Sequence, residues 1–150
     1  LPDPASAAWL DSVVEEVVDP DAAIIDPHHH LWPAGGSLPY GLADLEEDIG
    51  SGHRVIDTVF VECGAAYDRE APVPFAPVGE TQFVVREAKR SGRQVMGGIV
   101  AHADVRNAAD LDAVLAAHGV AGEGRFRGIR HAGAHALHSE ALTIAGRAPA

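Results

Sequence analysis

Residues 22–33 read AAIIDPHHHLWP, a short apolar run followed by three consecutive histidines. The apolar run is bounded by prolines, and its length and composition predict a short buried strand over residues 22–25, ending at Asp26. On an extended backbone, side chains two residues apart point the same way. His28 and His30 are therefore expected on one face and His29 on the opposite one. Imidazole at the end of a buried strand is costly unless it is paired or binds a ligand.

Two imidazoles on one face can bind one divalent metal ion, with each nitrogen at about 2.0–2.1 Å. His28 and His30 are therefore candidate metal ligands. Asp26 has the same strand parity and is a candidate third ligand or a residue that orients one of the histidines. A solvated histidine patch in a loop is the alternative. The position directly after an apolar strand favours the metal ion.

The rest of the chain alternates strand-like and helix-like segments. The further predicted strands are residues 54–63, 95–105 and 124–131. The predicted helices are residues 3–18, 42–52, 80–92 and 107–119. Such alternation is typical of a parallel sheet with right-handed crossovers. The sequence thus predicts an α/β fold of parallel β/α units preceded by an N-terminal helix.

Composition restricts the classes of function. The chain has 150 residues, 47% hydrophobic and 22% charged, which fits one globular domain. Its net charge of -11 argues against nucleic acid and membrane surfaces as partners. No apolar run is long enough to span a bilayer. The single cysteine, Cys63, fits a reducing cytoplasm and is more typical of a small buried residue than of a nucleophile.

The later predicted strands also end in polar side chains. These are Glu62 on the second strand, His102 and Asp104 on the third, and Arg130 and His131 on the fourth. The carboxyl ends of parallel strands share one edge of a sheet, which is where α/β proteins bind ligands. One shared site is therefore predicted at this edge. His118, at a helix end, receives no functional role.

The segments IIDPHHHLW, TVFVECGAAY, PVGETQF, GIVAHADV and FRGIRHA together resemble the amidohydrolase-related proteins, with the similarity running from about Ile24 to His131. These are metal-dependent TIM-barrel hydrolases of the second amidohydrolase group, which includes lactonases and related decarboxylases. The resemblance implies that the chain is the first half of a (β/α)8 barrel. It also implies a divalent metal cofactor, expected to be zinc, although some relatives work without metal.

The resemblance also implies roles for the strand-end residues. His28 and His30 would be the metal ligands of the first strand, and His102 and His131 would be catalytic. Glu62 and Arg130 would bind substrate, since a guanidinium suits a substrate carboxylate. The expected reaction is attack by an activated water on a lactone, ester or amide carbonyl of a small carboxylated compound. A non-catalytic α/β binding module and a phosphoesterase-type metal-dependent barrel are the alternatives.

The chain departs from this family in its second half. The family's further histidines on strands five and six and its aspartate on strand eight have no counterpart here. His135 and His138 follow Arg130 too closely, because a parallel crossover needs about a dozen residues. We therefore expect residues 1–150 to be a single partial domain with an irregular tail over 132–150, inactive alone. Two open sheet edges favour self-association into a homo-oligomer.

Overall fold

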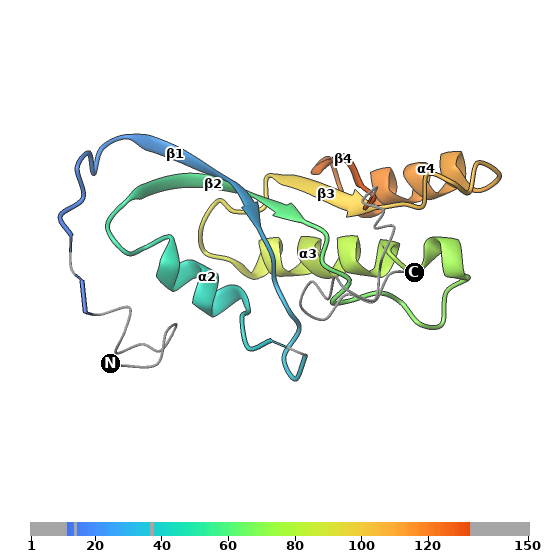
Figure 1. Ribbon diagram of the computed structural model, residues 1–150, viewed down its shortest axis with the longest axis horizontal. Coiled ribbons are helices and arrows are strands. Elements are labelled where there is room, and N and C mark those ends of the chain that lie inside the picture. The colour runs from blue at the N-terminus through green and yellow to red at the C-terminus, as the bar shows by residue number, and fades with distance from the viewer. Residues whose placement is uncertain (1–11, 14, 37, 133–150) are drawn as a thin grey trace, which may run out of the picture.

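The computed structural model describes residues 12, 13, 15–36 and 38–132. The chain alternates strands and helices along this part, as predicted (Figure 1). In order, the elements are β1 (Ala23–His29), α2 (Leu42–Asp48), β2 (Arg54–Val61), the 3-10 turn η1 (Val73–Phe75), α3 (Val78–Arg90), β3 (Gly98–His102), α4 (Leu111–Ala121) and β4 (Phe126–Arg130). The α/β class is therefore confirmed. No helix in the described part of the chain is long and apolar enough to cross a membrane.

The four strands form one sheet in the order β1-β2-β3-β4, and each neighbouring pair is parallel. Figure 1 shows α2 and α3 beneath the strands. Side chains from these two helices share one buried cluster with the inward side chains of the sheet, among them Phe60 and Ile99. The helix α4 packs against the same face of the sheet as α2 and α3. The ring of His118 on α4 stacks on Phe126 of β4, with centroids 5.5 Å apart, and Phe126 packs against the buried cluster. The opposite face carries exposed Ile25 and no helix from the described residues.

The first strand is longer than predicted. It runs past Ile25 to His29 and includes Pro27, which has no N–H to donate. Proline is tolerated here because β1 is an edge strand and its pairing with β2 is irregular between Asp26 and His29. His28 and His29 therefore belong to the end of the strand itself, and His30 follows it directly.

The predicted helix over residues 3–18 is wrong where the structure describes it. Residues 12, 13 and 15–18 contain no helix. Val13 is 68% exposed and Val18 is fully exposed, so these two residues of the expected apolar stripe are not packed against the rest of the chain. An amphipathic helix of this length depends on such packing. Residues 1–11 of this prediction, and residues 133–150 of the predicted irregular tail, lie outside the described residues.

Replacing Gly79 with alanine should destabilise the fold by about 1–3 kcal/mol, because overpacking forces the backbone to shift. A Cβ at Gly79, in the first turn of α3, would lie 2.6 Å from the backbone nitrogen of Asp68 and 3.0 Å from the carbonyl oxygen of Ala66. The matched control is Gly119→Ala in α4, where a Cβ meets nothing within 4 Å. In urea unfolding, the free energy of unfolding of this control should rise by about 0.5–1 kcal/mol, because alanine is a better helix former than glycine. Equal effects of the two substitutions would contradict the close approach of the loop to α3.

Candidate functional site at the carboxyl edge of the sheet

The polar residues that end the four strands come together at one edge of the sheet. The Nδ1 of His30, just after β1, lies 2.7 Å from the carbonyl oxygen of Val61 on β2. Arg130 at the end of β4 reaches across β3 and donates from Nε to Glu62 Oε1 at 2.9 Å. His102 Nδ1 lies 3.1 Å from the carbonyl oxygen of Arg130. The predicted convergence of strand-end residues on one rim is confirmed.

His28 and His30 point to the same side of β1, as predicted. Their Nε2 atoms are 3.3 Å apart and their rings are edge-on, with centroids 4.9 Å apart. Two nitrogens bound to one tetrahedral ion at about 2.0–2.1 Å would be separated by about 3.3–3.4 Å. His29 points to the opposite side, where it is buried and its Nε2 lies 2.9 Å from Thr58 Oγ1. This spacing fits two ligands of one metal ion, and without a metal ion it also fits a hydrogen bond between the two rings.

Asp26, the candidate third ligand or orienting residue, contacts the backbone of His28 and not a histidine ring. Its Oδ1 accepts a hydrogen bond from the backbone N–H of His28 at 3.0 Å. The carboxylate therefore holds the backbone that carries the histidine pair. Across the described residues, no group of three or more His, Cys, Asp or Glu side chains is arranged to hold a metal ion. The donor spacing fits two positions of a tetrahedral ion, and the described part of the chain supplies these two alone.

Three histidines at this edge share one arrangement. The Nδ1 atoms of His30, His102 and His131 each face a backbone carbonyl of the neighbouring strand or its end, at 2.7, 3.1 and 3.2 Å. A carbonyl accepts only, so each Nδ1 carries the proton. The Nε2 of each neutral ring is then left with its lone pair, the form needed by a metal ligand or a general base. Burial lowers the pKa of His30 below its ordinary value, which favours this neutral form.

Glu62 and Arg130, the predicted substrate-binding residues, bind each other. Besides the bond from Nε, the Nη2 of Arg130 donates to the carbonyl oxygen of Glu62. The side chain of Glu62 is 11% exposed and that of Arg130 is 31% exposed. Tyr67 also donates from its hydroxyl to Glu62 Oε2 at 3.4 Å, and burial raises the pKa of Tyr67. Among the described residues the outer nitrogen Nη1 of Arg130 has no hydrogen-bonding partner, so it can bind an anion.

His102 and His131, the predicted catalytic residues, stack with ring centroids 5.4 Å apart. The Nε2 of His131 lies 3.8 Å from Asp104 Oδ1. Asp104 accepts bonds from the side chain and backbone of Arg106, which hold the pKa of its carboxyl well below the usual range. An ionised carboxylate therefore faces His131. The ring of His102 also lies near that of Tyr67, with centroids 6.2 Å apart.

Sequence reasoning missed Glu80, which shapes the loop after β2. This residue in the first turn of α3 is 2% exposed. Its Oε1 accepts the backbone N–H of Ala65 at 2.7 Å and lies 3.6 Å from Cys63 Sγ. Burial, followed by the charge of Glu80, raises the pKa of Cys63 to about 12. The thiol stays protonated at neutral pH, as expected for a non-nucleophilic cysteine. Tyr67, also missed, lies in the long loop between β2 and α3.

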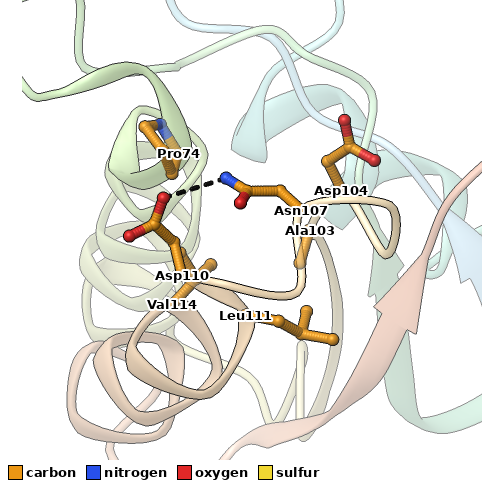
Figure 2. Close-up of a pocket in the computed structure, with 7 residues that line it drawn as sticks. All are labelled: Pro74, Ala103, Asp104, Asn107, Asp110, Leu111 and Val114. Carbon is orange, nitrogen blue, oxygen red and sulfur yellow. Dashed lines mark hydrogen bonds between the residues drawn. The ribbon is translucent and has the colours of Figure 1, made fainter.

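A small hollow lies beside the carboxyl end of β3, between η1 and the start of α4 (Figure 2). Asn107 donates to Asp110 Oδ2 at 3.0 Å across it, while Asp104 points away from this pair. The volume of about 20 Å³ is enough for one water molecule. This hollow is too small for a substrate, so the histidine pair remains the centre of the candidate site.

The chain was compared with protein-family models, curated proteins and solved structures, and none of them matches it. The chain is therefore characterised by its own geometry: a parallel α/β sheet whose carboxyl edge carries a histidine pair, two further histidines and a carboxylate–guanidinium pair.

Proposed function

We propose that the chain forms the metal-binding half of an amidohydrolase-type hydrolase, acting on a lactone, ester or amide carbonyl of a small carboxylated compound. The observation that carries this proposal is the pair of Nε2 atoms of His28 and His30, 3.3 Å apart at the edge where all four strands end. The hydrogen bond from His30 Nδ1 to Val61 supports it, because metal-bound histidines commonly donate their other N–H to a carbonyl.

The barrel architecture is part of the proposal. The four strands follow one another in sequence order, and the helices lie on a single face. Doubly wound sheets instead place helices on both faces and reverse the strand order at a switch point. Sequential parallel strands with helices outside are the repeating unit of a (β/α)8 barrel, which binds substrate at the carboxyl ends of its strands.

In this proposal each residue has a defined task. His28 and His30 hold a zinc ion, which when bound polarises a carbonyl and lowers the pKa of water. His102 presents an Nε2 lone pair that can accept a proton, because its Nδ1–H is held by Arg130. His131 is oriented by the carbonyl of Ala103, and its Nε2 lies 3.8 Å from the carboxylate of Asp104. The Nη1 of Arg130 binds the substrate carboxylate, while Glu62 fixes the guanidinium plane.

The chain should bind zinc weakly, at one site that depends on both histidines of the pair. Two ligands leave an open and poorly organised site, so the affinity should fall well short of that of a complete zinc centre. His28→Ala and His30→Ala should each weaken binding by about 100-fold or beyond detection. His53→Ala, which removes an exposed histidine elsewhere, is the matched control and should bind as the unmodified chain does. Calorimetry showing tight, stoichiometric zinc that survives His28→Ala would contradict the assignment.

The function itself is tested by ligand binding, because turnover by residues 1–150 is expected to stay at background. A small dicarboxylic acid, which represents the product of the reaction, should bind better with zinc than without it. Arg130→Met should remove this binding, and Arg69→Met, at an exposed loop position, should not. Equal affinity for the dicarboxylic acid with and without zinc would favour the non-catalytic binding module. A preference for inorganic phosphate over the acid would favour the phosphoesterase. Either result would overturn the hydrolase proposal.

A further inference from the structure

The negative charge of the protein is confined to one part of the chain. Residues 1–53 contain eleven Asp and Glu and no Lys or Arg, whereas residues 54–150 contain eleven of each kind. The whole net charge of -11 therefore belongs to the segment that includes β1 and α2. Such a separation of charge favours an oriented contact between molecules.

Four of these acidic residues directly precede β1. Glu15, Glu16, Asp19 and Asp21 are exposed and form what we name the acidic run. Asp19 Oδ1 accepts the backbone N–H groups of Asp21 and Ala22 at 3.2 and 3.1 Å, which fixes the turn that leads into the strand. The carboxylates of the run therefore stand beside the amino end of an edge strand.

The opposite edge of the sheet carries positive charge at the same end. Arg93, Arg125 and Arg127 line an open hollow of about 460 Å³ at the amino ends of β3 and β4, which we name the arginine hollow. None of these guanidinium groups pairs with a carboxylate within the part of the chain that the structure describes. Glu123, which also lines the hollow, is paired with Lys89 at 2.7 Å. Three cations without a carboxylate partner among the described residues thus line one hollow: Arg125 and Arg127 at the start of the second edge strand, and Arg93, which reaches toward Gly50 after α2.

Both outer strands lack a second neighbour in the described sheet, since β1 pairs only with β2 and β4 only with β3. Parallel pairing of β4 with the β1 strand of another molecule would bring the two amino ends together. That arrangement places the acidic run of one molecule against the arginine hollow of the other.

We propose that this chain pairs with a second copy of itself through β4 and β1, with the acidic run seated in the arginine hollow. A contact of this kind joins two different surfaces, so it either closes into a ring or continues as a filament. Closure after two copies gives eight parallel strands, the number at which side chains just fill a closed barrel. The face that carries exposed Ile25 then lies inside the ring, and the helices lie outside. This inference does not depend on the hydrolase proposal.

Two charge-inverted variants test the pairing by sedimentation equilibrium at low ionic strength. The acid-inverted variant is Glu15→Lys/Glu16→Lys/Asp21→Lys, which keeps Asp19 because it fixes the turn. The arginine-inverted variant is Arg93→Glu/Arg125→Glu, which keeps Arg127 because its guanidinium donates to the carbonyls of Gly97 and Gly124. The unmodified chain should form a salt-sensitive pair, and each variant alone should raise its dissociation constant at least about 100-fold.

An equimolar mixture of the two variants should pair again, because each inverted surface then meets its opposite. Loss of folding in either variant could not produce this rescue. The control Arg69→Glu/Arg86→Glu makes the same change in net charge at exposed positions away from the hollow and should associate like the unmodified chain. A monomeric unmodified chain, a mixture that stays monomeric, or stronger association of the less negative acid-inverted variant would each overturn the proposal.

Discussion

Arg130→Met should lower the free energy of unfolding by about 2–3 kcal/mol and should loosen the whole carboxyl edge. The substitution leaves Glu62 as a carboxylate that is only 11% exposed and has lost its counter-ion. Removing one partner of a buried ion pair typically costs about 3–5 kcal/mol, and the 31% exposure of Arg130 reduces that figure. Urea unfolding at neutral pH measures the change.

Lys89→Met is the matched control for this substitution. Lys89 and Glu123 are 2.7 Å apart, closer than the 2.9 Å between Arg130 and Glu62, but both side chains are about half exposed. This control should cost less than about 1 kcal/mol, because water screens an exposed pair. The double variant Glu62→Leu/Arg130→Met should recover most of the stability, since it leaves no unpaired charge. Equal losses in Arg130→Met and Lys89→Met would show that burial does not govern the pair.

The side of the strand to which each histidine of the site points could be predicted from the sequence, because side chains alternate regularly along a strand. Alternation alone places His28 and His30 on one side and His29 on the other, and their contacts in the structure agree. Parallel β/α order likewise brings Glu62 and Arg130 together, although 68 positions separate them. These results need only the periodicity of a strand and the handedness of the crossovers.

The partners within the site could not be predicted in the same way. Nothing in the sequence shows that Arg130 turns toward Glu62 and not toward an open cleft, because this depends on the reach of the side chain across β3. Glu80 could equally have been a solvated residue in the first turn of a helix, where acids are common. Its burial follows from the return of the loop over α3, which brings Ala65 to its carboxylate. The prediction of an N-terminal helix was wrong at the described residues 12, 13 and 15–18 for a related reason, because periodicity does not reveal whether a packing surface exists.

His118, which has no role in the site as read from the sequence, joins three elements in the structure. Its side chain is fully buried. Its Nδ1 lies 2.8 Å from Thr81 Oγ1 on α3, and its Nε2 lies 3.0 Å from the carbonyl oxygen of His102 at the end of β3. The carbonyl requires Nε2 to carry the proton, so Nδ1 accepts from the hydroxyl of Thr81. In its neutral form the ring therefore has a hydrogen-bonding partner at both nitrogens.

Replacing His118 with alanine should cost about 3–4 kcal/mol, from the cavity and from two polar groups that lose their partner. His118→Phe should keep the stacking on Phe126 and cost less, about 1–3 kcal/mol for the two unpaired groups. Thr81→Val removes one of the two bonds alone and should cost about 1 kcal/mol. Thermal or urea unfolding at pH 8, where the ring is neutral in both states, separates these losses from any effect of protonation.

The same residue should make stability depend on pH. Burial lowers the pKa of His118 below the ordinary histidine value of 6.5, so the unfolded chain binds a proton more readily than the folded one. The contribution of neutral His118 to the free energy of unfolding is fully present above pH 6.5. It declines as the pH falls from there through the pKa of His118 in the folded state. His29 shifts in the same direction, also through burial, so part of the decline should survive in His118→Phe. Urea midpoints between pH 8 and pH 5 should therefore fall less steeply for His118→Phe than for the unmodified chain, and identical slopes would show that His118 does not titrate with unfolding.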